Sequence, residues 1–416
     1  MIENTRRKLM LLTEAFPFGY GEPFLIAELP YLCEVFDVTI VSLDTNSPLE
    51  KKIPPDVKVI RLNITLSLFD RIRYFFSFMH DDVCRKECRL VADGKERVIK
   101  RILQSITMYS AGTKWFNELV KRPEFGEQEI LYSYWYNDKI IGTALALRGN
   151  PSRPVLVTRV HGYDLYNERK PLGRQPFKPV IDSYLDHIYF VSKAGFSYYQ
   201  KTFGMVDEQK YAMMSLGTIN TFGMAKENES STFNLLSCSN IIPLKRIPLI
   251  VDGIAHIESR KIHWIHIGDG EQYDAMQNYA QVNLGSKSNC TFTFLGRLTN
   301  EEVHTFYETV PIDCFLTVSE SEGGSPVSIQ EALSYGIPVI GTSVGGIPEM
   351  VEANGILLSE NPTSQQVADA ILKLAAAKDS CILSSFRSNS RKIWENKFNA
   401  ENNFVTFTQS LLSLIC

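Results

Sequence analysis

Short β-rich runs alternate with amphipathic helical stretches along most of the chain, and this alternation constrains the fold more than any other feature. Strands that are each followed by a helix pair in parallel, and the helices then cover both faces of the sheet. We expect one such series in the N-terminal half, with strands at residues 8–14, 38–43, 57–62, 130–134, 155–160, 188–192 and 213–217. A second series is expected at residues 233–237, 263–268, 291–296, 314–319, 339–342 and 356–358, followed by helices at 363–377, 381–398 and 404–414.

A length of 416 residues exceeds what one hydrophobic core ordinarily organises. The polar stretch 220–232 separates the two series and is interpreted as a linker. The chain is therefore predicted to be an α/β protein with two Rossmann-like, doubly wound domains, at residues 1–219 and 233–398, and a terminal segment at 399–416. Ligands of doubly wound sheets bind beside the carboxyl ends of the strands, so a cleft between two facing domains is the expected site.

Composition excludes several classes of protein. The net charge of -4, with both signs mixed along the chain, argues against a nucleic-acid partner. The eight cysteines are scattered and are interpreted as reduced residues of a cytoplasmic protein. Glu14 interrupts the first apolar run too early for a signal peptide. No stretch approaches the about 18 apolar residues of a membrane span, so any membrane contact would be peripheral.

The most informative segment follows the expected strand at 314–319. It reads Ser-Glu-Ser-Glu-Gly-Gly-Ser-Pro-Val-Ser-Ile-Gln-Glu-Ala-Leu-Ser-Tyr-Gly-Ile-Pro from Ser319. We expect Ser325 to cap a helix that has Pro326 at its first position. A helix N-terminus that follows glycines presents free N–H groups and suits a phosphate. Glu331, about one turn into the helix, can accept hydrogen bonds from a vicinal diol such as ribose, and Glu322 in the loop is expected to point freely into the cleft. The alternative interpretation is a helix that is merely well capped; the two flanking acids favour a functional site.

This segment closely resembles the signature of family-4 retaining glycosyltransferases, of the kind found in bacterial surface-polysaccharide synthesis. In the usual form seven residues separate the two glutamates, whereas eight separate Glu322 and Glu331 here. The resemblance implies that Glu331 holds the donor ribose and that Glu322 contacts the transferring sugar. It places the donor's sugar and diphosphate against the loop and the first helical turn, formed by Gly323, Gly324, Ser325, Pro326, Val327 and Ser328.

A second match lies in the segment Leu236-Ser-Cys-Ser-Asn-Ile-Ile-Pro-Leu-Lys-Arg. It is similar to the family's turn in which an Arg, and a Lys five residues later, neutralise the leaving diphosphate. Lys245 fits the Lys, but Asn240 occupies the Arg position and lacks its charge. Arg246 is a candidate to compensate, or is simply solvated. The loss of one such stabiliser costs about 2.7–4 kcal/mol of transition-state stabilisation.

The remaining matches are looser. The segment Arg159-Val-His-Gly-Tyr-Asp resembles the family's His-Gly-x-Asp segment, so His161 would contact the donor sugar; a purely structural histidine is the alternative. Gly19 and Gly21 resemble the glycine loop after the first strand. Three further residues would line the nucleotide pocket at strand ends: Gly268, Leu295 and Arg297.

The resemblance implies the GT-B architecture, with the last helix crossing back to the N-terminal domain. It also implies retention of configuration, no essential metal or cofactor, and a UDP- or GDP-linked sugar as co-substrate. The acceptor would be a saccharide, with a lipid-linked one as one option. His263 and His266 do not form a zinc motif, in agreement with the expectation about metal.

Residues 69–107 mix large apolar side chains with many Arg and Lys residues. One hypothesis is that this region rests on the anionic inner face of the plasma membrane and receives a lipid-linked acceptor. The other is that it forms ordinary helices with a solvated face, because acids interrupt the basic residues.

Other functions on the same fold stay open. One is a sugar-nucleotide epimerase or a glycan phosphorylase, although no convincing motif for the pyridoxal lysine of a phosphorylase is present. Another is a catalytically silent relative that binds a nucleotide sugar or acts as a scaffold. Asn240 and the lengthened loop keep the silent relative open, whereas Glu331, Lys245 and His161 favour a transferase.

Overall fold

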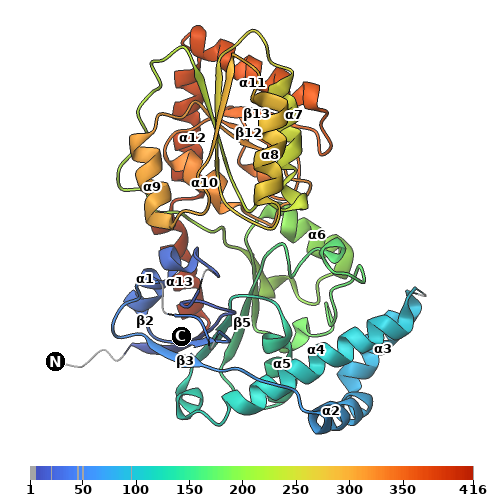
Figure 1. Ribbon diagram of the computed structural model, residues 1–416. Helices are drawn as coiled ribbons and strands as arrows, with labels where there is room; N and C mark the ends of the chain where they lie inside the picture. The colour runs from blue at the N-terminus through green and yellow to red at the C-terminus, as the bar shows by residue number, and fades with distance from the viewer. Residues whose placement is uncertain (1–5, 20, 45, 49–50, 95, 416) are drawn as a thin grey trace, which may run out of the picture. The chain divides into compact units, whose positions relative to one another are not determined.

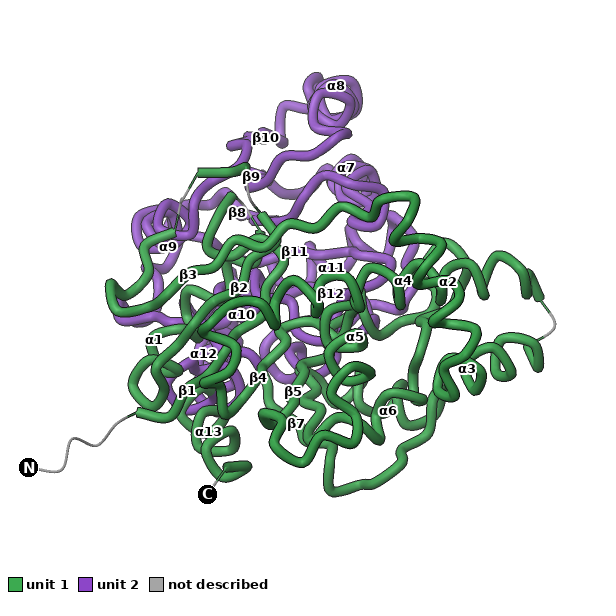
Figure 2. Tube along the Cα trace, turned by 90° about the horizontal axis from the view of Figure 1, so that it is seen from below, with its two compact units in different colours: residues 1–215, 404–416 green, residues 216–403 purple. Residues whose placement is uncertain are grey.

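The computed structural model describes residues 6–19, 21–44, 46–48, 51–94 and 96–415. The chain divides into two compact units, coloured separately in Figure 2. Unit 1 comprises Met1–Ser215 and Phe404–Cys416, and unit 2 comprises Leu216–Asn403. Residues 220–232, expected to form a linker, therefore lie within unit 2.

Unit 1 is a parallel sheet with helices on both faces (Figure 1). Among the described residues, the strand order is β3-β2-β1-β4-β5-β6-β7. The strands are β1 (Arg7–Leu12), β2 (Phe36–Ser42), β3 (Lys58–Arg61), β4 (Ile130–Ser133), β5 (Val155–Val160), β6 (His187–Phe190) and β7 (Tyr211–Met213). The helices are α1 (Leu25–Val35), α2 (Leu68–His80), α3 (Asp82–Asp93), α4 (Val98–Leu119), α5 (Asp138–Leu147) and α6 (Lys193–Phe203). Apolar runs such as Leu9–Leu12 are buried on both faces of the sheet, as expected for a central parallel strand.

Unit 2 repeats this plan. Among the described residues, its parallel sheet has the order β10-β9-β8-β11-β12-β13. The strands are β8 (Phe233–Cys238), β9 (Ile262–Ile267), β10 (Cys290–Phe294), β11 (Cys314–Thr317), β12 (Val339–Thr342) and β13 (Gly355–Leu358). The helices are α7 (Ile247–Ala255), α8 (Tyr273–Leu284), α9 (Asn300–Thr309), α10 (Val327–Ser334), α11 (Ser364–Asp379) and α12 (Leu383–Lys397). The order of strands reverses between β8 and β11, which is where such sheets bind ligands.

The predicted fold class, two Rossmann-like α/β units, is confirmed. One predicted strand, 213–217, is misplaced, because β7 ends at Met213. The buried residue Tyr211 fixes the position of β7, since its hydroxyl donates to Asp182 Oδ2 at 2.8 Å. Beyond the strand, Met214 N–H still donates to Phe190 O at 2.8 Å.

The last helix, α13 (Ala400–Ser413), begins in unit 2 and ends in unit 1. Phe407 and Leu411 are fully buried in the core of unit 1, and the Arg159 guanidinium carbon lies 4.0 Å from the centre of the Phe407 ring. The helix starts earlier than the expected residue 404, because Ala400 N–H donates to Thr218 O at 3.1 Å and Thr218 N–H donates to Phe398 O at 2.9 Å. The segments around Thr218 and Asn399 therefore run side by side as a short parallel bridge.

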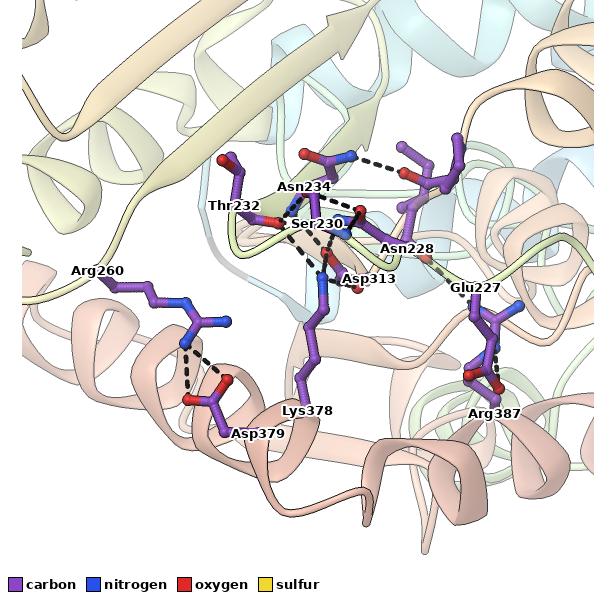
Figure 3. Close-up of polar contacts among 12 residues, drawn as sticks. Glu227, Asn228, Ser230, Thr232, Asn234, Arg260, Asp313, Lys378, Asp379 and Arg387 are labelled. Carbon is purple, nitrogen blue, oxygen red and sulfur yellow. Dashed lines mark hydrogen bonds and ion pairs between the residues drawn. The ribbon is translucent and has the colours of Figure 1, made fainter.

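The polar segment 220–232 is held to the body of unit 2 by a buried carboxylate. Asp313 Oδ2 accepts a hydrogen bond from Asn228 Nδ2 at 2.6 Å and pairs with Lys378 Nζ, as Figure 3 shows. Burial raises the pKa of Asp313, and these donors act against that rise. Among the described residues, none of the helices combines the length and the apolar character needed to cross a bilayer.

Candidate functional site

The carboxyl ends of β8 and β11 meet at the point where the strand order of unit 2 reverses. The loop after β8 leads through a short 3-10 helix, Pro243–Lys245, into α7. The loop after β11 carries Glu322 and the glycines and leads into α10. This edge therefore brings two of the predicted segments together.

Lys245 and Glu322 form an ion pair between these two loops. The Glu322 carboxylate also accepts a hydrogen bond from Ser319 Oγ at 2.6 Å, and Glu322 as a whole is only 9% exposed. The expectation that Glu322 points freely into a cleft is therefore wrong. A carboxylate this buried needs partners, and Lys245 and Ser319 supply them.

The start of α10 differs from the predicted cap. Pro326 is the N-cap residue and Val327 the first helical residue, and no side chain caps the helix. Ser325 Oγ instead accepts a hydrogen bond from Gln330 Nε2 at 2.6 Å. Among the described residues, nothing accepts a hydrogen bond from the N–H groups of Val327 and Ser328. The positive end of the helix dipole is thus left available to an anion.

Glu331 is the most unusual group at this edge of the sheet. Glu331 is only 7% exposed, yet its carboxylate has no hydrogen-bond partner within the described part of the chain. Desolvation raises the pKa of Glu331 to about 7. Burial of Cys238, at the end of β8, and to a smaller extent the charge of Glu331 raise the pKa of this thiol to about 12. Because an unpaired buried carboxylate is costly, this site favours a ligand that donates hydrogen bonds.

The rest of α10 explains this burial. Ile329, Ala332 and Leu333 pack into the core beneath the sheet and fix the helix rotation. The helix ends at Ser334, and Gly336 takes the left-handed conformation with φ of 72°. The core packing of α10 thus keeps Glu331 in place without direct contacts to the carboxylate.

The positions of Asn240 and Arg246 differ from the diphosphate-binding role that the resemblance suggested for this turn. Asn240 is exposed in the loop after β8. The Arg246 guanidinium donates to Val318 O at 2.6 Å, to Ser319 O at 3.0 Å and to Glu360 O at 2.9 Å. Arg246 therefore holds the end of β11 through these bonds.

Gly268, Leu295 and Arg297 follow β9 and β10 at the same edge. Gly268 has φ of 138°, and a Cβ at this position would lie 1.9 Å from Ser239 O. Its N–H donates to Gly296 O at 2.7 Å. Leu295 and Arg297 are both exposed, and Arg297 pairs with Asp269 at 2.6 Å.

A second glycine loop, after β12, packs against the acidic loop. Gly345 has φ of 53°, and a Cβ there would lie 2.4 Å from Glu322 O and 2.6 Å from Gly323 O. Gly346 N–H donates to Gly323 O at 3.3 Å. The sequence shows the glycine pair, but only the structure shows that it packs against the backbone of Glu322 and Gly323.

In unit 1, His161 follows β5 in a rigid setting. Its backbone N–H donates to Asp164 Oδ1 at 2.7 Å, and its ring stacks on Tyr134 with centroids 4.6 Å apart. Nε2 lies 3.1 Å from Tyr134 O, so Nε2 carries the proton and Nδ1 is the unprotonated nitrogen. Burial lowers the pKa of His161 to about 4, which keeps the ring neutral at physiological pH.

Gly19 and Gly21 lie in the loop after β1, and Tyr20 between them is outside the described residues. A carboxylate that the sequence analysis did not select organises this loop. Glu22 accepts hydrogen bonds from the backbone N–H groups of residues 14, 15 and 16, and from Trp135 Nε1 at 2.5 Å. A Cβ at Gly21 would lie 2.7 Å from Ala15 Cβ, so the loop is tightly closed.

A pocket of about 500 Å³ lies at the opposite, amino edge of the unit 2 sheet, around Asp313 and Arg260 (Figure 3). Its cations are paired: Lys378 with Asp313, Arg260 with Asp379, and Arg387 with Glu227. The carboxyl edge therefore remains the candidate site. Within the described ranges, no group of three or more His, Cys, Asp or Glu side chains is arranged to hold a metal ion.

The comparisons with known proteins follow this geometry. Residues 232–377, which contain β8 to α11, match the family described as "Glycosyl transferases group 1". Unit 2 carries a group 1 glycosyltransferase domain. The resemblance read from Glu322, Glu331 and Lys245 is thereby confirmed at the level of the family.

Individual relatives support this assignment over part of the chain. The uncharacterised glycosyltransferase MJ1178 of Methanocaldococcus jannaschii is 32% identical over 135 residues, or 32% of this chain and 35% of that protein. The O-antigen biosynthesis glycosyltransferase WbnH of Escherichia coli is 26% identical over 179 residues, or 43% of this chain and 48% of that protein. The chain thus spans half or less of the length of these curated relatives.

The fold as a whole is that of GT-B proteins. Anabaena Alr3699/HepE, solved in complex with UDP and glucose, has a TM-score of 0.67 and 15% identity, covering 98% of this chain and 100% of that chain. The group 1 domain thus sits in a chain whose two Rossmann-like units both have counterparts in solved GT-B structures.

Proposed function

We propose that this chain is a retaining glycosyltransferase that moves a sugar from a nucleotide-diphosphate sugar to a saccharide acceptor in polysaccharide biosynthesis. The observation that carries the proposal is Glu331, a buried carboxylate without a protein partner in the described chain, at the carboxyl edge of a group 1 domain. The two hydroxyls of a ribose are the donors that such a carboxylate requires. The neighbouring N–H groups of Val327 and Ser328 suit the diphosphate.

The transfer step needs stabilisation of the leaving nucleotide diphosphate. Lys245 is the candidate cation on the loop after β8, and its ammonium has three hydrogens, one of which bonds to Glu322. The other two are left for phosphate oxygens, so the ion pair orients Lys245 without consuming it. Together with the α10 dipole, this cation supports transfer without a metal ion.

As positive charge develops at the anomeric carbon, the acceptor hydroxyl attacks from the face that the phosphate leaves, and the phosphate takes the proton. Configuration is then retained. His161, held neutral by burial, would contact the donor sugar as a hydrogen-bonding group and not as a cation.

The relatives guide the choice of substrates. Structures similar to this chain were solved with UDP, and one relative acts in O-antigen biosynthesis. We therefore propose a UDP-linked sugar as the first donor to test, with a GDP-linked sugar as the alternative. The seven described cysteines are free thiols, which supports a reducing, cytoplasmic site of action.

Calorimetric titration with UDP and GDP in the absence of metal tests the proposal. The wild type should bind one nucleotide, Glu331→Ala should bind it at least about tenfold more weakly, and Glu395→Gln on the exposed side of α12 should match the wild type. The donor identified in this way is then incubated with saccharide acceptors, and NMR reads the anomeric configuration of the product. Binding without any turnover of donor would instead identify a silent relative.

A further inference from the structure

Helix α2 in unit 1 turns its most apolar side toward solvent. Leu68 is 75% exposed and Phe69 is 72% exposed, and four more large apolar side chains of the same helix are exposed: Ile72, Phe75, Phe76 and Met79. The side chains that fix α2 to the protein are Tyr74 and Phe78, which are buried against α4 and its surroundings. Figures 1 and 2 both show α2 and α3 at the outer margin of unit 1.

The exposed apolar residues form one continuous stripe. At about 100° per residue, they fall within a sector about 120° wide on the helix surface. Arg71 lies about 40° beyond one edge of this sector, and Arg73 lies about 40° beyond the other. Both arginines are exposed. We call this stripe with its two arginines the α2 face.

The exposed charges of α2, α3 and the start of α4 are mostly positive, although the whole chain has a net charge of -4. Three acids of this region are engaged by cations of other segments: Asp70 lies 3.5 Å from Lys114, Asp81 bonds to Arg148, and Glu87 bonds to Arg174. The exposed cations of α2, α3 and the start of α4 are Arg71, Arg73, Arg85, Lys86, Arg89, Arg97 and Lys100. Asp82, Asp93 and Glu96 are also exposed, so among the described residues of this region exposed cations outnumber exposed carboxylates by seven to three.

We propose that the α2 face docks onto an anionic phospholipid surface, with the apolar stripe inserted among the lipid chains and the surrounding cations at the headgroups. An apolar stripe flanked by arginines is the arrangement of an interfacial amphipathic helix. Exposed cations near such a surface each add attraction that falls off within a Debye length. A second copy of this chain would place the same cations opposite each other, which favours lipid over self-association. The proposal stands on unit 1 alone and does not depend on the transfer reaction.

Vesicle sedimentation tests the proposal. The wild-type protein should sediment with vesicles of phosphatidylglycerol and phosphatidylcholine in equal parts, less so at high salt, and not with phosphatidylcholine alone. The triple variant Phe69→Ser, Ile72→Ser and Phe76→Ser should partition at least about tenfold more weakly, and so should Arg71→Glu with Arg73→Glu.

Matched controls come from unit 2. Val282→Ser removes an apolar side chain that is 79% exposed on α8. Lys373→Glu with Lys392→Glu changes the net charge by the same amount as the arginine variant, at two exposed positions. Both controls should sediment as the wild type does. Wild-type protein that stays in the supernatant at low salt, or α2 variants that bind like the wild type, would overturn the proposal.

A conservative variant tests insertion without removing an apolar side chain, so that misfolding does not account for the result. Phe76→Trp keeps a large apolar residue in the stripe, and its emission should be quenched by brominated lipid chains beyond the quenching of the wild type. No added quenching would contradict insertion. A wild-type dimer in light scattering that becomes a monomer in the triple variant, without vesicle binding, would identify a second copy as the occupant and refute the lipid.

Discussion

The ammonium of Lys245 is bonded to the carboxylate of Glu322, so the loops that follow β8 and β11 are joined at the point where the strand order reverses. Side chains of both residues are mostly buried, at 20% and 11% exposure. Removal of either charge leaves the other charged group poorly solvated and without a counter-ion. Removal of both charges leaves no such unpaired group.

We expect Lys245→Met to lower the free energy of unfolding by about 2 kcal/mol, because Glu322 loses its counter-ion. The double variant with Glu322→Gln should be less destabilised than the sum of the single variants, with a coupling energy of about 1–3 kcal/mol. Urea unfolding of the four proteins measures this coupling. Additive effects would mean that the pair does not form in solution.

Glu331 should make nucleotide binding depend on pH. Its pKa is raised to about 7, and the ionised form is the better acceptor for both ribose hydroxyls. Affinity should therefore increase between pH 6 and pH 8 in the wild type and stay nearly flat in Glu331→Gln, which isolates Glu331 from phosphate titration. A parallel rise in both proteins would assign the effect to the phosphate.

The same carboxyl has the opposite effect on the stability of the free protein. Its pKa is higher when folded than the ordinary 4.5, so the folded form binds more protons in this interval and stability falls as pH rises from about 4.5 to 7. At pH 8, Glu331→Gln should be more stable than the wild type by on the order of 2 kcal/mol in the absence of ligand. Thermal unfolding of the wild type and of Glu331→Gln, at about pH 4.5 and at pH 8, measures this difference in stability.

His161 should stay neutral throughout the working range. Burial lowers its pKa to about 4, so the NMR signal of its ring should not titrate between pH 5 and 8. Protonation of the unfolded chain near pH 6.5 then makes the folded protein lose stability as the pH falls from about 6.5 to 4. A midpoint near 6.5 in the folded protein would show that the ring is solvated.

Gly268→Ala should disrupt the edge of the unit 2 sheet. The added Cβ would lie 1.9 Å from Ser239 O, in a backbone conformation with φ of 138°. We expect a loss of more than about 2 kcal/mol in unfolding free energy and loss of nucleotide binding. Gly149→Ala is the matched control, because φ is 74° there and the Cβ would meet nothing within 4 Å. It should cost about 1 kcal/mol and leave binding intact.

Phe407→Ala should destabilise unit 1 by about 3–5 kcal/mol, although this residue follows the whole of unit 2 in the sequence. Hydrogen exchange should speed up in β1 and β4 and remain unchanged in β8 and β11. Val405→Ala, on an exposed part of the same helix, serves as the control and should have little effect. Equal loss of protection in both units would show that they unfold as one.

Much of the fold can be predicted from the sequence, because buried parallel strands are short apolar runs separated by amphipathic helices. The expected strand 339–342 coincides with β12, and most others lie within a few residues of the observed ones. The misplaced strand near Met213 depended on a tertiary contact, the bond between Tyr211 and Asp182. No local pattern contains that bond.

The residues of the candidate site could be predicted from the sequence, but the contacts between them could not. Spacing places Glu331 and Lys245 on segments that the sheet brings to one edge. It does not show that Glu322 is paired with Lys245, that Ser325 bonds to Gln330 rather than capping α10, or that Arg246 is bonded to carbonyl groups. The contacts of Lys245 and Arg246 join residues that are distant in sequence. The bond of Ser325 to Gln330 is local, but the sequence does not show which of several possible partners Ser325 takes.

The burial of Phe407 and Leu411 in unit 1 also has a consequence for synthesis on the ribosome. Residues 1–215 emerge first, yet the core they form lacks these two side chains until all of unit 2 has been made. The usual order, in which the N-terminal domain matures first, is therefore reversed here. Unit 2 can complete its own core while unit 1, whose sheet is covered on this side by α1, still lacks the part of its core that α13 supplies.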